Sequence, residues 1–380
     1  MLPLDGVLVV GLEVAVSAPH CTRQLADMGA RVIKVESPDG GDFARYYDDV
    51  VHGTSSYFAW ANRGKESVAL DLKTEHGRHA LEGLLAHADV FVQNLAPGAA
   101  ERMDLDAKSL CARHPRLVAL DISGYGDGGP RSDARAYDLL VQSEAGSCAV
   151  TGVAEHPAKP GIAVADIGTG MTAANAVLAA LLARATSEAG AAISIAMFDV
   201  VTDWMSWALH QARFTGVDPP RLGIGSPVVA PYGAYRTTDD QMVVFGTTND
   251  GEWRRLATVM LERPDLAEDA RYATNSDRCR HRDELNHVIA DWTARHTYGE
   301  ATAAAEAAAI GWARFNSPAE VVAHPQLSER KRWVSTTAPG GPFDSLRPPA
   351  DSADWQWSPG RVPALGEHTE RVLSEFGLDG

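Results

Sequence analysis

The sequence predicts an α/β protein in which a doubly wound, parallel-sheet large domain is followed by a smaller α+β domain. In the first half of the chain, short apolar runs such as GVLVVGL at 6–12 alternate with helical patterns. Strands that are apolar on both faces are typical of parallel sheets covered by helices on both sides. A glycine- and proline-rich stretch at 215–233 then interrupts this order, and the composition changes after it.

The large domain is predicted to contain five strands and the helices between them. Ser17 and Pro19 suit the start of the first helix, and Gly29 suits its end. Residues 168–185 are apolar almost all round, which predicts a buried helix. The strands are expected at 6–12, 31–36, 67–72, 89–95 and 117–123, and the helices at 17–28, 74–87, 99–112 and 136–147. A strand or helix start follows at 193–201, and a helix at 203–214.

These patterns divide the chain into domains. We expect a large Rossmann-like domain at 1–200 that is completed by 325–380, a linker helix and loop at 201–228, and a small domain at 229–324. Within the small domain, YGAYRTT and QMVVFGTT predict a hairpin that turns at Asp239 and Asp240. The proline-rich tail is expected to end in the helix EHTERVLSEFG.

The charge and cysteine content exclude several classes of protein. A formal net charge of −16 repels nucleic acid and acidic membranes, so neither is expected as a partner. No uncharged apolar run reaches membrane-spanning length, and the N-terminus, with Asp5 and Glu13, does not resemble a signal peptide. The four cysteines form no CxxC pair, which favours free thiols and a cytoplasmic location. No HExxH motif or paired histidines indicate a metal site.

Asp166 is the residue with the clearest chemistry. It lies in PGIAVADIGTGM, directly before the apolar helix, where the helix dipole and free N–H groups stabilise a carboxylate anion. An N-cap is the commonest role of such an aspartate, and a nucleophile is the alternative. The surrounding glycines, Gly161, Gly168 and Gly170, would let a ligand approach the backbone. A nicotinamide cofactor is not expected, because the turn GLEVAVSAPH lacks the glycine fingerprint.

Longer motifs extend along nearly the whole chain, and several are specific in order and spacing. They include PHCTRQLADMGARVIKVESPDGGDFAR (19–45), NRGKESVALDLK (62–73), DVFVQNLAPGAAERM (89–103), ISGYGDGGP (122–130), AYDLLVQSEAG (136–146), PGIAVADIGTGM (160–171), APYGAYRTTDD (230–240) and LGEHTERVL (365–373). In these motifs the chain resembles the family III CoA-transferases, which include formyl-CoA transferase and carnitine CoA-transferase. The 2-methylacyl-CoA racemases share their fold.

The resemblance implies an enzyme that moves coenzyme A from an acyl-CoA to a free carboxylic acid. In the family, the aspartate matching Asp166 attacks the thioester and forms a mixed anhydride and CoA thiolate. The thiolate then forms an enzyme–CoA thioester, and the acceptor acid reverses these steps. Covalent intermediates divide one difficult exchange into easier ones. Coenzyme A is thus a substrate, with no permanently bound cofactor, and Tyr137 joins Asp166 as a catalytic candidate.

Family position also implies the residues that bind coenzyme A. Lysine and arginine side chains would contact its phosphates, although each could equally be a solvated surface residue. Val16 and Ser37 depart from formyl-CoA transferase, which has a catalytic glutamine and a CoA-binding arginine there, so formate and oxalate are not the expected acids. The implied CoA channel consists of Lys73, Asn94, Leu95, Arg102 and Arg135, with Leu70 against the adenine.

A 2-methylacyl-CoA racemase is the alternative function. Racemisation needs general bases on both faces of Cα. This chain has Tyr137 and Asn249 about where the racemases have a histidine and a glutamate, and neither takes a proton at neutral pH. A CoA-binding protein without catalysis would be expected to lose Asp166. Transfer is therefore favoured over both alternatives.

The segment from 11 to 48 looks most like family members that act on C4–C5 dicarboxylates such as mesaconate, citramalate, itaconate or succinate. Such an acid leaves a second carboxylate in the pocket, and burying it unpaired costs several kcal/mol. Arg45 is the candidate cation, and a surface ion pair with Asp42 or Asp48 is its alternative role. The family architecture further implies an interlocked homodimer.

Overall fold

The computed structural model describes residues 1–379, which pack into two compact units. The first unit consists of Met1–Ser147, Pro160–Trp207 and the chain from Ser328 onward; the second consists of Cys148–Lys159 and Ala208–Leu327. Both units are thus assembled from separate stretches of sequence. The domains predicted above placed 148–159 in the large domain and treated 201–228 as a linker.

A six-stranded parallel sheet forms the centre of the first unit, in the order β3-β2-β1-β4-β5-β8. Its strands are β1 (Leu8–Leu12), β2 (Arg31–Glu36), β3 (Lys65–Ala69), β4 (Val90–Gln93), β5 (Val118–Ser123) and β8 (Ala191–Ala196). The α/β class and the parallel sheet are therefore confirmed. The order reverses between β1 and β4, and parallel α/β sheets bind ligands at the carboxyl ends of the strands near such a point.

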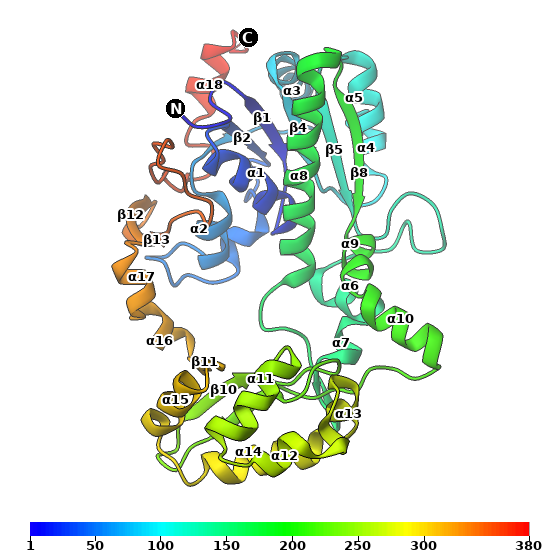
Figure 1. Cartoon of the computed structure of the whole chain (residues 1–380). Helices are drawn as coiled ribbons and strands as arrows, with labels where there is room; N and C mark the ends of the chain where they lie inside the picture. Colours follow the sequence, from blue (N-terminus) through cyan, green and yellow to red (C-terminus); the bar gives the residue numbers. More distant parts are fainter. Residues whose placement is uncertain (380) are drawn as a thin grey trace. The chain divides into compact units, whose positions relative to one another are not determined.

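Helices cover both faces of this sheet. On one face, α1 (Ser17–Asp27) and α8 (Val164–Ser187) lie side by side (Figure 1). On the other face, α3 (Glu75–His87), α5 (Ala107–Arg113) and α18 (Thr369–Glu375) pack with alternate strand residues into one apolar core. Strand residues of opposite parity, such as Val9, Val32 and Val90, are also fully buried, so the apolar runs of these strands are covered on both faces.

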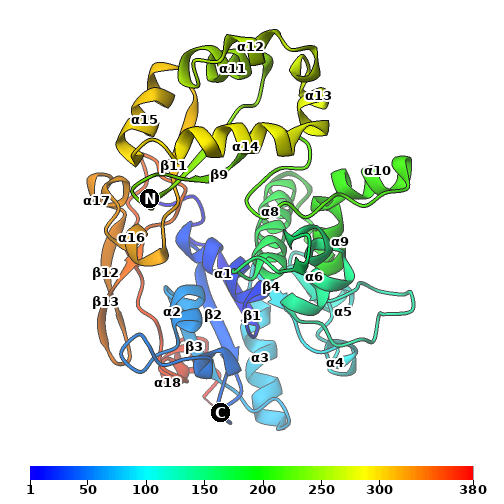
Figure 2. The same cartoon turned by 90° about the horizontal axis from the view of Figure 1, so that it is seen from below.

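Shorter elements complete the first unit. Figure 2 shows β12 (Trp333–Ala338) and β13 (Gly341–Leu346) as an antiparallel hairpin, which the sequence patterns did not predict. The remaining elements are a 3-10 turn η1 (Phe43–Tyr46), α2 (Ser56–Asn62), α4 (Ala99–Arg102), α6 (Asp138–Glu144) and α9 (Met197–Trp204), while α7 (Ser147–Val150) and α10 (Ser206–Thr215) span the unit boundaries.

The second unit is built on an antiparallel sheet in the order β11-β10-β9. Its predicted hairpin is confirmed, because β9 (Tyr232–Arg236) pairs with β10 (Met242–Gly246) across Asp239 and Asp240. The other elements are β6 (Gly152–Val153), β7 (His156–Pro157), α11 (Asp250–Arg255), η2 (Leu256–Met260), α12 (Pro264–Glu268), η3 (Ala270–Tyr272), α13 (Asn275–Arg280), α14 (Arg282–Thr293), α15 (Tyr298–Ala307), β11 (Gly311–Arg314), α16 (Pro318–Val322) and α17 (Pro325–Glu329), the last of which crosses into the first unit.

The long apolar helix differs most from its prediction. α8 begins at Val164 rather than at 168, so Asp166 lies inside its first turn and not before it. It is also not buried all round: Leu182 is 77% exposed and Met171 is 47% exposed. By its length and mean hydropathy (1.3), α8 would be able to span a membrane. In this structure it packs against helix α1 and against strands β5 and β8 of the sheet.

Candidate active site

Asp166 is placed by the topology at the carboxyl edge of the parallel sheet. α8 leads into β8, which runs parallel to its neighbours, so the N-terminal turn of α8 lies at the edge where the strands end. Asp166 occupies this first turn. Among residues 1–379 it has no hydrogen-bond or ion-pair partner.

Asp138, and not Asp166, caps α8. The N-cap residue Ala163 provides no side-chain cap. Instead, the Oδ1 of Asp138, the first residue of α6, accepts the backbone N–H of Ala165 at 3.0 Å, and its Oδ2 accepts the amide of Gln142 at 2.7 Å. The interpretation of Asp166 as an N-cap is therefore wrong, because a residue from a preceding helix already fills that role.

The electrostatic surroundings of Asp166 favour its protonated form. Burial comes first and the nearby charge of Asp138 second, and together they raise the pKa of Asp166 to about 7. Burial and the charge of Asp138 thus act against the stabilisation of the anion that was expected from the helix dipole. A carboxylate with this pKa is more basic than an ordinary aspartate and is still substantially ionised at neutral pH.

Two tyrosines belong to the same site. Tyr137 directly precedes Asp138 and is 57% exposed. Tyr47 follows η1, and burial together with the charges of Asp42, Asp166 and Tyr137 raises its pKa to about 12. The structure therefore brings Tyr137, Asp138 and Tyr47 to Asp166. Sequence reasoning missed Tyr47 and Asp138, although the unusual RYY in GDFARYY was a signal for exposed aromatic residues.

The glycines after Asp166 allow close packing rather than ligand approach. A Cβ on Gly170 would lie 2.6 Å from the carbonyl oxygen of Ser17, and one on Gly168 would lie 2.0 Å from the ring of Trp204. Of the three glycines near Asp166, only Gly161 would place a Cβ with no other atom within 4 Å. The ligand-approach interpretation is thus wrong for Gly168 and Gly170, which let α8 pack on its neighbours.

The loop between β1 and α1 is fixed by its neighbours. Asn94 binds both backbone groups of Val14, at 2.9 Å each, so the amide predicted to line the CoA channel also holds this loop. Ala15 has a left-handed φ of 61° and donates its N–H to Asp42 at 3.0 Å. These contacts fix the backbone directly before Val16, which is buried and stands where formyl-CoA transferase has its glutamine.

Three predicted CoA-binding cations are exposed near the ends of strands. Lys73 follows β3, Arg102 lies in α4 after β4, and Arg135 lies in the loop after β5. None of the three side chains has an ion-pair or hydrogen-bond partner within residues 1–379, so all are available to a phosphate-bearing ligand. Of the apolar candidates, Leu70 is buried directly after β3 and Leu95 is half-buried after β4.

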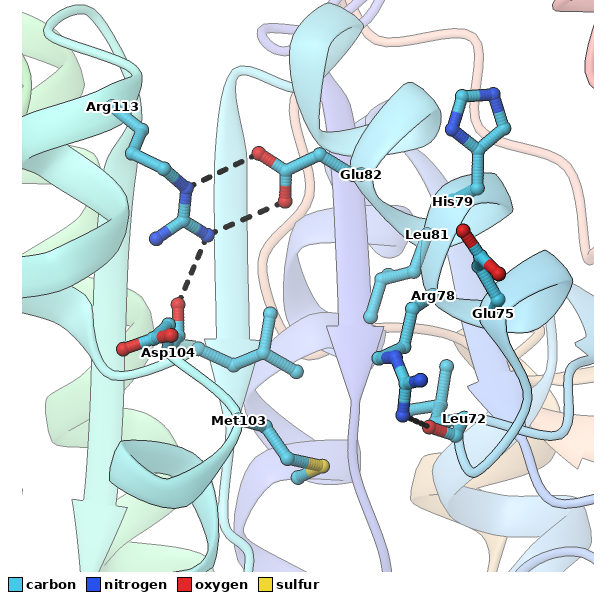
Figure 3. Close-up of a pocket in the computed structure, with 10 residues that line it drawn as sticks. Leu72, Glu75, Arg78, His79, Leu81, Glu82, Met103, Asp104 and Arg113 are labelled. Carbon is cyan, nitrogen blue, oxygen red and sulfur yellow. Dashed lines mark hydrogen bonds and ion pairs between the residues drawn. The ribbon is translucent and has the colours of Figure 1, made fainter.

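A hollow of about 390 Å³ is lined by Leu72, by residues of α3 and by residues between Met103 and Arg113 (Figure 3). Its floor includes Leu72 and Met103, the sequence neighbours of Lys73 and Arg102. The two arginines that line it have partners within the chain: Arg113 pairs with Glu82 and binds the carbonyl of Asp104, and Arg78 binds the carbonyl of Leu72. Neither Asp166 nor any residue of the predicted CoA channel lines this hollow.

Arg45 has a different partner from those expected. It binds Glu36 through two nitrogens at 2.7 and 2.9 Å, donates to the carbonyl of Pro363 at 3.1 Å, and covers the ring of Phe58 at 3.8 Å. Its side chain is 11% exposed. Neither Asp42 nor Asp48 is its partner, and Arg45 is not a free cation for a substrate carboxylate.

Residue Asn249 of the second unit has a structural role. It is the N-cap of α11, and its side-chain oxygen accepts the N–H of Glu252 at 2.9 Å. No group of three or more His, Cys, Asp or Glu side chains in the described part of the chain is arranged to hold a metal ion.

These observations agree with one class of protein, an acyl-CoA-dependent transferase. The family model of CoA-transferase family III matches residues 4–369, and the chain belongs to this family. It is 34% identical to a succinate–glutarate CoA-transferase of Agrobacterium fabrum, over 98% of this chain and 96% of that protein. It is 32% identical to a succinyl-CoA:mesaconate CoA-transferase of Haloarcula hispanica, over 99% and 96%.

A solved structure has the same fold. The crystal structure of a CAIB/BAIF family protein from Brucella suis superposes with a TM-score of 0.83, at 33% identity over 99% of both chains. The resemblance found in the sequence motifs is thus confirmed, and the protein is an enzyme of the CoA-transferase class.

Proposed function

We propose that this enzyme transfers coenzyme A through covalent intermediates on Asp166. The observation that carries the proposal is an unpaired, partly buried carboxylate whose pKa is raised to about 7, at the ligand-binding edge of the sheet. A charged carboxylate that is not held in an ion pair is free to attack, and perturbed groups of this kind concentrate at functional sites.

The reaction then proceeds without ATP. An oxygen of Asp166 attacks the acyl carbonyl of the donor, the C–S bond breaks, and CoA leaves as the thiolate. The thiolate attacks the Asp166 carbonyl of the mixed anhydride and releases the donor acid. The acceptor carboxylate then attacks the Asp166–CoA thioester, and the returning thiolate takes the new acyl group and frees Asp166. Tyr137, beside Asp138, is a donor for the oxyanions that form in these steps.

The CoA part of the substrate is assigned to the residues at the strand ends. Lys73, Arg102 and Arg135 supply the positive charge that phosphates need on a chain of net charge −16. The remaining members of the proposed channel are Leu70, Asn94 and Leu95.

We assign the acceptor to the C4–C5 dicarboxylates. The support comes from the relatives, which are named for succinate, glutarate and mesaconate. Arg45 no longer contributes to this argument, because Glu36 occupies its guanidinium. Racemisation has less support, since Tyr137 is a phenol and Asn249 a helix cap, and neither is a base.

The proposed assembly is an interlocked homodimer in the cytoplasm. α8 exposes apolar side chains, such as Met171 and Leu182, to solvent, which is unfavourable. A second copy of the chain would cover them. The four cysteines are free thiols, as expected in a reducing compartment.

Trapping the intermediate tests the nucleophile. The enzyme is incubated with succinyl-CoA, treated with hydroxylamine, and digested for mass spectrometry; the hydroxamate is expected on Asp166. Asp166→Asn should lower the transfer rate at least about 1,000-fold. Asp199→Asn is the matched control, because Asp199 lies in the first turn of the neighbouring helix α9, and it should keep full activity. Normal transfer by Asp166→Asn would refute the mechanism.

A further inference from the structure

A row of aromatic rings leads from α8 to the surface beside Asp166. His20 packs against Gly170, one helical turn after Asp166, and its ring stacks on Trp60 with centroids 5.0 Å apart. Trp60 meets the edge of Tyr57 at 6.3 Å, and Tyr57 meets the edge of Tyr47 at 5.8 Å. We call His20, Trp60, Tyr57 and Tyr47 the aromatic row.

Tyr47, at the outer end of this row, has an unused hydroxyl group. The side chain is 49% exposed, and its hydroxyl has no hydrogen-bond partner among residues 1–379. The turn before it is fixed, because Asp42 is fully buried and accepts the N–H of Ala44 at 2.9 Å. Burial and the neighbouring charges, Asp166 included, raise the pKa of Tyr47 to about 12, so it keeps its proton at neutral pH.

A neutral donor is what the reaction needs at this place. The acceptor arrives as an anion at a site that already contains Asp138 and Asp166. A permanent cation would pair with Asp166 and lower its pKa, and the described residues place none against it; Arg45 is bound to Glu36. A phenol binds a carboxylate without quenching the nucleophile.

We propose that Tyr47 binds the free acid: its hydroxyl donates a hydrogen bond to the carboxylate that attacks the Asp166–CoA thioester, while Tyr57 and Trp60 pack against the carbon chain. This inference rests on the proposed function. In this step the acid oxygen bonds to the Asp166 carbonyl carbon, the C–S bond breaks, the electron pair leaves with CoA as the thiolate, and Tyr47 keeps its proton. Asp166 is neutral as a thioester, so the incoming anion meets less repulsion than in the free enzyme.

By microscopic reversibility, Tyr47 also contacts the donor acid as it leaves. The loss of the hydroxyl should therefore weaken binding of both free acids and leave the attack on acyl-CoA nearly unchanged. This pattern separates Tyr47 from a residue that only supports the fold, because a structural defect would affect both half-reactions.

The test compares Tyr47→Phe with Tyr46→Phe, using succinyl-CoA as donor and glutarate as acceptor. Tyr46 is adjacent and 69% exposed, so it is a matched control. Tyr47→Phe should raise the KM of glutarate and the inhibition constant of the product succinate by about tenfold each. The kcat/KM for succinyl-CoA in forming the Asp166–CoA thioester, followed by mass spectrometry without acceptor, should change less than about threefold. Tyr46→Phe should change none of these values.

Three outcomes would overturn the inference: an unchanged KM for glutarate in Tyr47→Phe, an equal loss in thioester formation, or the same effect in Tyr46→Phe. Absence of a thioester on Asp166 in the unaltered enzyme is a different result, because it would refute the proposed function itself. Thermal melting of both variants confirms that each has folded.

Discussion

The loop from β1 to α1 and the first turn of α8 both bury acidic groups, but only the loop surrounds them with cations. Glu13 is fully buried, with the amine of Lys65 at 2.7 Å and that of Lys34 at 3.6 Å. Burial alone would raise the pKa of Glu13, yet the two lysines hold it below its usual value. At α8, burial is joined by the like charge of Asp138, and the pKa of Asp166 rises to about 7.

The comparison separates charges that build the site from a charge that reacts in it. We call Glu13, Lys34, Lys65 and Asp42 the paired cluster. Asp42 also holds Ala15 and the turn leading to Tyr47. A buried ion is tolerated only when it is paired or can change its protonation state. The cluster is stable by the first route, and Asp166 by the second.

Breaking a pair in the cluster should have the largest effect on stability. Lys34→Met leaves Asp42 buried without its partner at 2.9 Å, so the free energy of unfolding should fall by about 3–5 kcal/mol. Urea denaturation measures this loss. Arg113→Met is the control, since its ion pair with Glu82 is exposed and should contribute less than about 1 kcal/mol. Equal losses in the two variants would remove the distinction between the buried cluster and the surface.

Removing the like charge beside Asp166 should shift the pH profile of the enzyme. Asp138→Asn keeps an oxygen for the N–H of Ala165, so α8 stays capped, but the carboxylate charge is gone. The pKa of Asp166 should fall. The acid limb of kcat/KM, expected near pH 7 in the unaltered enzyme, should move to lower pH.

The rate at saturating pH should drop by up to about tenfold, because a less basic carboxylate is a weaker nucleophile. Glu144→Gln, at the exposed C-terminal end of α6, is the control and should leave the profile unchanged. An acid limb that stays in place in Asp138→Asn would mean that burial alone sets the pKa of Asp166.

Hydrophobic patterns predicted the strands that contain short apolar runs. β1, β2 and β5 lie within two residues of their predicted limits. β3 was predicted at 67–72 but runs over Lys65–Ala69. Lys65 is buried and paired with Glu13, and a pattern of apolar residues does not reveal a buried charged residue of this kind. The helix predicted at 99–112 is two helices, separated where Asp104 adopts a left-handed φ of 54°.

The site shows the same limit. Motifs pointed to Asp166, but its local sequence predicted an anion stabilised by the helix dipole. Burial of Asp166 and the charge of Asp138, which lies in another helix, both act against this prediction. The partner of Arg45 could not be predicted either, because Glu36, Asp42 and Asp48 are all close in sequence and only the folded chain selects Glu36. Motif similarity located the nucleophile, whereas its electrostatics depend on tertiary contacts.

The smallest expected effect is the dependence of stability on the protonation of Asp166. Its pKa is about 7 in the folded chain and near the usual 3.8 in the unfolded chain, so between these values the folded state holds a proton that the unfolded state has released. The contribution of Asp166 to stability is therefore fully present below about pH 4 and is lost as the pH rises through about 7.

Asp166→Asn cannot ionise and should be more stable than the unaltered protein by about 1 kcal/mol at pH 7.5, a figure reduced for partial solvent screening, with little difference at pH 4.5. Urea titrations at the two pH values measure this, with Asp199→Asn as the control. A stability gain that does not depend on pH would show that Asp166 is not protonated in the folded enzyme, and the contrast between the paired cluster and the unpaired carboxylate would then lose its electrostatic basis.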